Sequence, residues 1–303
     1  MCIRDRKEIG ERIRASWDAD ELSLYGRFDF ILAKDGTPKI LEFNADTPTS
    51  LLEASVIQWQ WKEDVFPECD QFNGIHEGLV QSWKDIFPKK GEIYFAGALE
   101  NNEDTGTLQY LASTAMEAGF STRVLDMQAL DLQNGRFFDP AGELVNRCFK
   151  LYPWEWMVDE SPDGCLAEME WLEPIWKLVM SNKAILATLY ELFPDSPYVL
   201  PCYLSRPRSG LFCKKPVFSR EGHNVSVVDI RNWEEHVRIA ETEGDYNTGA
   251  YVYQEYVEPT VYSGRYPVIG SWIIGGEAAG IGIRENRMEV TDNLSEFVPH
   301  IIG

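Results

Sequence analysis

Alternation of hydrophobic and polar positions is clearest near the start of the chain. In LYGRFDFILA (24–33) and KILEFN (39–44) successive side chains switch character, and KDGTP (34–38) between them is rich in turn residues. This pattern predicts two antiparallel strands joined by a turn over 24–44. Apolar residues then recur at helical spacing and predict a helix over about 49–63, through Leu52, Val56, Ile57 and Trp59.

The middle of the chain reads as a βαβ-like unit. A buried strand over 92–98 (EIYFAGA) precedes a polar loop over 100–106, a helix over 106–118 and a strand over 121–126. The segment 147–177 is rich in Trp and Pro, and we expect it to cross between subdomains. A further helix is predicted in NKAILATLYELF, capped by Ser181 and ending before Pro194.

The last third is dominated by antiparallel strand patterns. LFCKKPVF and VSVVDI flank the polar loop SREGHN (219–224), and YVYQEYV alternates in the same way. PVIGSWII and AAGIGIR face each other across Gly275 and Gly276, a signal for a two-residue hairpin turn. Together these elements predict a mixed α+β and α/β fold.

Composition restricts the class of protein. The chain has 303 residues, of which 44% are hydrophobic and 13% aromatic, so a large core is available and a disordered chain is excluded. The 28 basic and 49 acidic residues give a net charge of −21, which argues against a nucleic-acid-binding surface. An acidic surface is compatible with a cationic partner such as a polyamine, although the more common reason for it is solubility.

Neither a membrane segment nor a cysteine framework is visible in the sequence. No apolar run approaches the ~20 residues of a membrane helix, and the charged start lacks the apolar region of a secretory signal. We therefore expect a cytoplasmic protein without a membrane partner. The six cysteines are scattered without a CxxC pair and the four histidines lie far apart, so neither a disulfide scaffold nor a zinc cluster is expected.

Two carboxylates face each other in the predicted hairpin. If it closes symmetrically about Asp35 and Gly36, Asp29 lies opposite Glu42, and Arg27 lies opposite Asn44 on the same face. Opposed carboxylates repel, and a divalent cation between them removes that cost. Carboxylate and amide oxygens suit Mg²⁺, and the adjacent guanidinium suits a phosphoryl group. On these residues alone, an exposed polar face neutralised by Arg27 is the commoner interpretation.

A second set of residues could bind phosphate. Lys183 and Lys215 lie near the loop 219–224, whose backbone amides could cradle an anion, and Arg284 ends a late strand. The strand YVYQEYV could contact adenine through its backbone. There is no GxxxxGK[ST] sequence, so this is not a P-loop. Taken singly, each of these residues is more commonly a surface cation or part of a core strand.

Several segments in a fixed order resemble the glutathionylspermidine synthase family, and most closely its single-function, synthetase-only bacterial acid–amine ligases. They run from about Leu24 to the end of the chain: YGRFDF, LEFNADTPTSLLEA, KLYPWEW, EPIWKLVMSNKAIL, KKPVFSREGHNV, GSWIIGGEAAGIGIREN and TDNLSEFVPH. The resemblance implies an ATP-grasp-like synthetase with a small α/β (pre-ATP-grasp) subdomain, in which the metal-binding strands precede the ATP-binding lid.

The same resemblance implies roles for individual residues. Two Mg²⁺ ions would be bound by Asp29, Glu42 and Asn44. The catalytic residues in contact with the transferring phosphate would be Arg27 and Arg284. ATP would lie beneath a lid formed by 218–225 and would contact Lys183, Lys215, Ser219, Gly222, Asn224 and Gln254. The substrates would contact Thr47, Thr49, Glu103 and Asp104.

The resemblance also predicts domains and an activity. We expect an N-terminal remnant of a truncated chain over 1–20 whose first six residues are an unrelated leader. Metal-binding strands and a helix follow over 21–90, then the α/β subdomain over 91–150, and the lid with the last catalytic strands over 151–303. We expect no Cys-His amidase domain before them. The expected enzyme joins a glutathione-like or peptide carboxylate to a polyamine-like amine through an acyl-phosphate, using ATP and Mg²⁺. A nucleotide-binding module without turnover and an ATP-grasp ligase of amino acids are the alternatives. The oligomeric state is left open.

Overall fold

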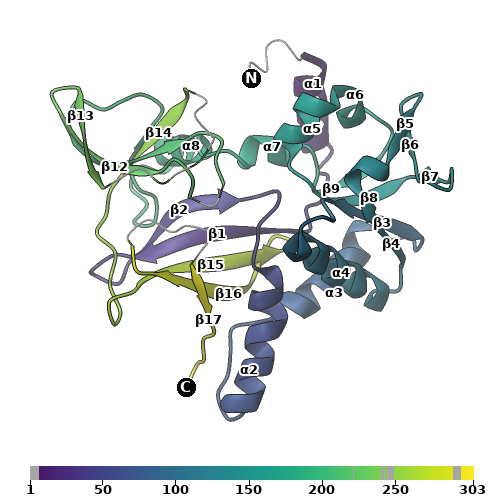
Figure 1. Ribbon diagram of the computed structural model, residues 1–303, viewed down its shortest axis with the longest axis horizontal. Coiled ribbons are helices and arrows are strands. Elements are labelled where there is room, and N and C mark those ends of the chain that lie inside the picture. The colour runs from purple at the N-terminus through teal and green to yellow at the C-terminus, as the bar shows by residue number, and fades with distance from the viewer. Residues whose placement is uncertain (1–6, 221, 240–241, 243, 245–248, 289–294) are drawn as a thin grey trace.

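The computed structural model describes residues 7–220, 222–239, 242, 244, 249–288 and 295–303. The predicted leader (1–6), Glu221 of the lid loop and residues 291–294 of the last family segment lie outside the described residues. Figure 1 shows a parallel sheet and an antiparallel lid sheet at opposite ends of the long axis, with a second antiparallel sheet between them. The protein is therefore a mixed α+β structure with several sheets.

The central sheet combines the beginning and the end of the chain. Its order is β17-β16-β15-β1-β2, and all neighbours are antiparallel. The strands span Tyr25–Leu32 (β1), Pro38–Asn44 (β2), Tyr266–Ile274 (β15), Glu277–Asn286 (β16) and Glu296–Val298 (β17). The strands predicted over 24–44 are confirmed, and so is the hairpin at Gly275 and Gly276, whose φ angles of +57° and +89° suit glycine.

The first hairpin contains the predicted pairs of polar residues, although it does not close symmetrically about Asp35 and Gly36: next to the turn, Leu32 pairs with Pro38. Asp29 pairs with Glu42 and Arg27 pairs with Asn44. A β-bulge between Asp29 and Phe30 then shifts the pairing, so that Phe30 lies opposite Ile40. The bulge lies beyond the polar residues, and the four of them keep a common face.

Helices cover one side of the central sheet. The helix predicted over 49–63 is present as a π-helical turn, Glu53–Ile57, which continues as α2, Gln58–Val65. Helix α3 (Ile75–Ile86) places Leu79 and Trp83 in the largest core, which also contains Trp272 of β15. Val56, Ile57 and Trp59 stay exposed, since only the opposite side of this helix meets the sheet.

The predicted βαβ unit is confirmed. The parallel sheet has the order β4-β3-β8-β9, with β3 at Glu92–Gly97, β4 at Ser121–Asp126, β8 at Arg147–Leu151 and β9 at Glu170–Leu172. Helix α4 begins at Asn102, four residues earlier than predicted, because the Asn101 side chain accepts a hydrogen bond from the amide of Glu103. The predicted polar loop is thus largely the first turn of this helix.

The segment 147–177 does more than cross between subdomains. It adds β8 and β9 to the parallel sheet, with α5 (Trp154–Glu160) and α6 (Pro162–Cys165) between them, before α7 (Lys177–Met180) leads toward the lid. A small sheet, β5 (Asp131–Gln133), β6 (Arg136–Phe138) and β7 (Leu144–Val145), precedes it after a 3₁₀ turn at Met127–Ala129. Helix α1 (Lys7–Asp18) packs nearby through Ile9.

The lid sheet has the order β10-β14-β11-β12-β13. Its strands span Cys202–Tyr203 (β10), Gly210–Pro216 (β11), Ser226–Arg231 (β12), Glu234–Ile239 (β13) and Tyr251–Glu255 (β14). Helix α8 (Ile185–Leu192) packs against β10 and β14. The predicted cap by Ser181 is wrong: the amide of Ala184 is instead bonded to the side chain of Asn182, and Lys183 lies just before the helix.

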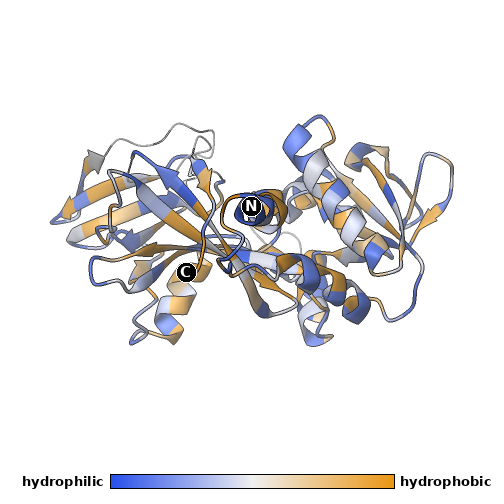
Figure 2. Cartoon of the chain, turned by 90° about the horizontal axis from the view of Figure 1, so that it is seen from below, coloured by the Kyte–Doolittle hydropathy of each residue, from blue (hydrophilic) through white to orange (hydrophobic). Residues whose placement is uncertain are grey.

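Apolar side chains gather inside each part of the chain. Figure 2 shows the hydrophobic stretches of the strands alternating with polar segments at the edges and loops. Two large cores lie against the faces of the parallel sheet, and two smaller ones lie in the lid. In the described part of the chain, no helix is both long and apolar enough to cross a membrane.

Candidate active site

Three of the predicted residues form one charged cluster on the central sheet. Arg27 binds Asp29 with both ends of its guanidinium, at 2.6 Å (Nε–Oδ1) and 2.9 Å (Nη2–Oδ2). Arg284, from β16, donates to the same carboxylate at 2.7 Å. Burial opposes the charge on Arg27, but the contact with Asp29 outweighs it and raises the pKa of the guanidinium. For Arg284, burial and the neighbouring Arg27 outweigh the contact with Asp29 and lower the pKa of the guanidinium.

Glu42 connects this cluster to the first lysine. Its carboxylate lies 3.2 Å from Nζ of Lys183, and Asn44 bridges toward it and toward Asp29 at 3.4 and 3.3 Å. Burial alone would raise the pKa of Glu42, but Lys183, Lys215 and Arg27 lower it to about 2. Glu42 is thus an anion at neutral pH and can serve as a ligand for a cation.

A glycine makes room for the first arginine. Gly270 of β15 lies opposite Asp29 in the sheet, and a Cβ at this position would lie 2.7 Å from Cδ of Arg27. Glycine inside a strand often marks such a close approach. The guanidinium can therefore cross the sheet surface and reach both Asp29 and the backbone carbonyl of Thr49.

The second lysine is held in place by the strands beneath the lid. Lys215 donates to the side chain of Gln254 at 2.7 Å and to the carbonyl of Leu41 at 3.0 Å, and Gln254 donates to the carbonyl of Ile40 at 2.8 Å. These bonds attach the lid strands β11 and β14 to β2 of the central sheet. Lys183 completes the arrangement by donating to the backbone carbonyl of Ser219 at 2.7 Å.

A cavity of about 90 Å³ lies between the lid and the central sheet. Its walls are largely apolar, and the apolar side chains include Ile31, Leu41, Leu200, Val225 and Val268. Charged groups, among them Asp29, Glu42, Lys183 and Lys215, complete the lining. Of the residues predicted to bind nucleotide, it is lined by Lys183, Lys215, Gly222 and Gln254. Ser219 lies beside Lys183 but lines a neighbouring cleft, and Asn224 lines neither. Apolar walls combined with charged groups suit a flat base next to charged phosphates.

A second cavity, of about 290 Å³, opens on the other side of Glu42. It brings together the predicted catalytic, metal-binding and substrate residues that follow: Arg27, Glu42, Asn44, Thr47, Thr49, Glu103, Asp104 and Arg284. Asp29 lies at its edge, against Arg27 and Arg284, and lines the first cavity. Residues separated by up to 257 positions in the chain therefore meet at one site because β1 and β16 share a sheet with β15 between them.

Four further residues at this site were missed by the sequence analysis. Arg220 donates to Thr47 at 2.6 Å and pairs with Glu155, and Tyr152 and Trp156 line the larger cavity. Their segments, SREGHN and KLYPWEW, are both part of the family resemblance. The sequence offered two indications of them: the arginine in the loop SREGHN, and the aromatic and acidic residues that follow β8 in KLYPWEW.

The donor set matches a magnesium site that is completed by substrate. Among the described residues, no group of three His, Cys, Asp or Glu side chains could enclose a metal. Asp29, Glu42 and Asn44 instead offer two carboxylates and one amide on one face. Mg²⁺ is commonly bound by one or two carboxylates together with phosphate oxygens, so these residues fit it when a nucleotide supplies the rest.

Comparison with known proteins identifies relatives over nearly the whole chain. The family model described as glutathionylspermidine synthase preATP-grasp matches residues 6–303. A Haemophilus influenzae protein named "Putative acid–amine ligase" is 39% identical, and the match covers 95% of this chain and 77% of the relative. Trypanothione synthetase of Crithidia fasciculata is 28% identical over 96% of this chain and 49% of its own length.

A further relative and a solved structure also match nearly the whole chain. The bifunctional glutathionylspermidine synthetase/amidase of Escherichia coli is 26% identical over 98% of this chain and 52% of its own length, so the chain spans about half of these longer relatives. A glutathione synthetase-like effector from Globodera pallida superposes with a TM-score of 0.58 at 12% identity, covering 99% of this chain and 86% of that structure. This likeness concerns the fold alone.

Proposed function

The chain belongs to the glutathionylspermidine synthase family of acid–amine ligases, and from this premise we propose that it joins a carboxylic acid to an amine, using ATP and Mg²⁺, through an acyl-phosphate. One observation supports the proposal above the others. The apolar cavity with two lysines and the larger polar cavity share Glu42 and Gly222 in their walls. A phosphoryl group bound next to Glu42 in the first cavity can therefore meet an acid bound in the second.

The first cavity would bind the nucleotide. Its apolar walls suit adenine, and the side chains of Lys183 and Lys215 supply positive charge for the phosphates. Both lysines are largely buried and held by hydrogen bonds, so little side-chain entropy is lost when an anion arrives. Mg²⁺ would be held by Asp29, Glu42 and Asn44, and it supplies charge neutralisation and polarisation of the transferring phosphoryl group.

The two arginines would stabilise the charge that develops during transfer. Phosphoryl transfer depends mainly on positioning and on electrostatic stabilisation of the equatorial oxygens. Arg27 and Arg284 reach the junction of the cavities from neighbouring parts of one sheet, and their guanidinium groups donate in fixed directions. The acid's carboxylate oxygen would attack the γ-phosphorus there, giving an acyl-phosphate and ADP.

The second half-reaction would take place in the larger cavity. The neutral amine would attack the acyl carbon, the C–O bond to phosphate would break, and the amine would lose a proton as the amide forms. Thr47 and Thr49 lie on the side of the arginines and suit the acid, whereas Glu103 and Asp104, in the first turn of α4, suit a cationic amine. These assignments favour a peptide-like acid and a polyamine-like amine.

The experiment that tests this function is a substrate screen. Purified protein with Mg-ATP is incubated with pairs of peptides, thiol peptides or amino acids and polyamines, and released phosphate and product mass are measured. The proposal predicts ADP, phosphate and an amide for at least one pair. A product formed only from amino acids would favour the amino-acid ligase alternative. Tight nucleotide binding without amine-dependent ADP release for any pair would contradict ligase turnover and favour a nucleotide-binding module.

A further inference from the structure

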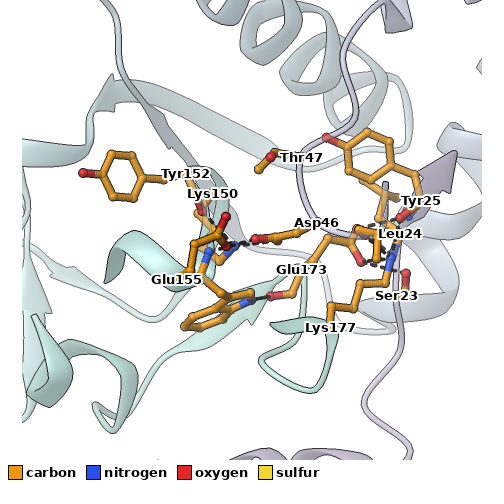
Figure 3. Close-up of polar contacts among 12 residues, drawn as sticks. Ser23, Leu24, Tyr25, Asp46, Thr47, Lys150, Tyr152, Glu155, Glu173 and Lys177 are labelled. Carbon is orange, nitrogen blue, oxygen red and sulfur yellow. Dashed lines mark hydrogen bonds and ion pairs between the residues drawn. The ribbon is translucent and has the colours of Figure 1, made fainter. Parts of the chain in front are cut away.

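A second cluster of charged residues lies at the open end of the metal-binding hairpin. Its members line neither of the two cavities described above, although Asp46 lines the neighbouring cleft that contains Ser219. It consists of two buried ion pairs, Lys150–Asp46 at 2.7 Å and Lys177–Glu173 at 2.9 Å. All four side chains are at most 3% exposed. Figure 3 shows these pairs between the residues that begin β1 and the segment that follows β2. We call these four residues the ion-pair joint.

The pair Lys177–Glu173 holds both strands of the hairpin. The ammonium group of Lys177 donates to the carbonyl of Tyr25, two residues before Arg27, and to that of Ala45 at 2.8 Å, one residue after Asn44. Glu173 accepts from the amides of Leu24 and Tyr25 at 3.1 and 3.0 Å, as Figure 3 shows. The strands are therefore attached to each other and to the segment after β9 at this end.

The pair Lys150–Asp46 holds the segment that follows β2. One oxygen of Asp46 binds Lys150, and the other accepts from the amide of Trp154 at 2.9 Å. Lys150 also donates to the carbonyl of Tyr152 at 2.9 Å. Asp46 directly precedes Thr47, which lines the larger cavity. This pair therefore connects the loop with Thr47 and Thr49 to the end of β8 and the start of α5.

The two pairs form one hydrogen-bonded unit. The indole of Trp154 donates to the backbone carbonyl of Glu173 at 3.0 Å and thereby links them. Each lysine ammonium has a carboxylate and at least one carbonyl as acceptors, so its position is over-determined. Side chains with fully satisfied partners in a dry interior have few alternative arrangements.

Stability alone is a weak reason for such a unit. Buried ion pairs are often no more stabilising than apolar residues of the same volume, because removing both charges from water is costly. Buried ion pairs are better suited to holding the segments that they join in one conformation. We propose that the ion-pair joint positions the metal-binding hairpin and the Thr47 loop for the reaction, which makes its four members positioning residues. This inference rests on the proposed function for its metal site and for its turnover readout.

The test removes each pair of charges together, so that no lone charge stays buried. The variants are E173Q/K177M and D46N/K150M, and the control is R123M/D139N, which removes an ion pair of 2.9 Å with a buried carboxylate on the same subdomain. Each protein is assayed for thermal stability, for Mn²⁺ affinity in the presence of ADP, and for kcat and the KM of the acid. Mn²⁺ serves as the probe of the site at Asp29, Glu42 and Asn44.

The two pair variants have different expected effects. E173Q/K177M lowers Mn²⁺ affinity and kcat about 10- to 100-fold, as loss of residues that orient metal ligands commonly does. D46N/K150M mainly raises the KM of the acid, since Asp46 precedes the Thr47 loop. The control keeps the wild-type Mn²⁺ affinity, kcat and KM. If a pair variant does not fold, E173Q/K177Q or D46N/K150Q replaces it, since each also removes both charges of its pair and keeps polar side chains at these positions.

Two results would overturn the inference. One is folded pair variants whose Mn²⁺ affinity, kcat and KM equal those of the control. The other is a wild-type protein that binds no Mn²⁺ with ADP, because there would be no metal site to position. A wild-type protein that binds Mn²⁺ but turns over no acid–amine pair contradicts the proposed function instead, and the Mn²⁺ affinities of the variants still decide about the joint.

Discussion

Gly270 pairs with Asp29 across β1 and β15, and its missing side chain leaves room for Arg27. The position of the Arg27 guanidinium thus depends on the free space above Gly270 as well as on the charge of Asp29. The sequence shows an isolated glycine in PVIGSWII, which by itself indicates only a bulge or a close approach. The identity of the side chain that lies over Gly270 depends on the pairing of β1 with β15, whose residues lie more than 230 positions apart, as in Phe28–Ser271. The local sequence around Gly270 does not reveal that pairing.

Gly270→Ala should therefore displace Arg27 while leaving the strand intact. We expect turnover to fall by about 100-fold, the scale of a misplacement of roughly 1 Å at a reacting group, with little loss of nucleotide affinity. Steady-state kinetics and nucleotide titration check this. Gly78→Ala, in α3 and away from the cavities, is the control. Equal kcat for the Gly270 variant and wild type would contradict the account.

Glu42→Gln tests the residue that lines both cavities. It removes the anion that faces Lys183 and the predicted metal, so turnover should fall about 10²- to 10³-fold. Circular dichroism should show an unchanged fold, because Gln fills the same volume. Glu277→Gln, an exposed substitution at the start of β16, should leave turnover unchanged. A Glu42 variant with wild-type turnover would remove this residue from the mechanism.

At the scale of elements, local patterns predicted the strands and failed at helix boundaries. Alternation predicts correctly which side chains share a face of the first hairpin, but it does not fix the register, since a shift by two residues keeps the same faces. The pair Asp29–Glu42 is present because the β-bulge after Asp29 offsets a turn that does not close symmetrically about Asp35 and Gly36. The predicted start of α4 and the predicted cap of α8 were wrong. In each case an asparagine side chain, Asn101 or Asn182, accepts the hydrogen bond from a backbone amide at the start of the helix, and neighbouring polar residues make the choice ambiguous in the sequence. The π-helical turn at Glu53–Ile57 has no signal in the sequence.

The last segment of the chain gives a prediction about pH. Nδ1 of His300 donates a hydrogen bond to Oε1 of Gln58 at 3.0 Å, and burial lowers the pKa of the imidazole. The unfolded chain therefore binds this proton more readily, and the free energy of unfolding should fall as pH drops below 6.5. His300→Asn, which does not titrate, should lose less stability between pH 7 and pH 5. Urea unfolding at both values checks this, and parallel curves for the two proteins would contradict it.

At the scale of the molecule, a strongly acidic chain concentrates positive charge where it would bind ATP. The net charge is −21, yet the two cavities contain Arg27, Lys183, Lys215, Arg220 and Arg284. The sequence predicted most of these residues through the family resemblance, but not their arrangement. That arrangement depends on a central sheet which joins β1 and β2 to β15 and β16, and on the hydrogen bonds by which Lys215 and Gln254 attach β11 and β14 to that sheet.

The central claim is that the carboxylate is activated by direct phosphoryl transfer at the junction of the two cavities. An acid labelled with ¹⁸O in both carboxylate oxygens tests it most directly, after incubation with Mg-ATP and an amine substrate. Mass analysis should find one ¹⁸O in the released phosphate and one in the amide for each turnover, with ADP as the nucleotide product. Phosphate without ¹⁸O, or AMP in place of ADP, would contradict the acyl-phosphate mechanism.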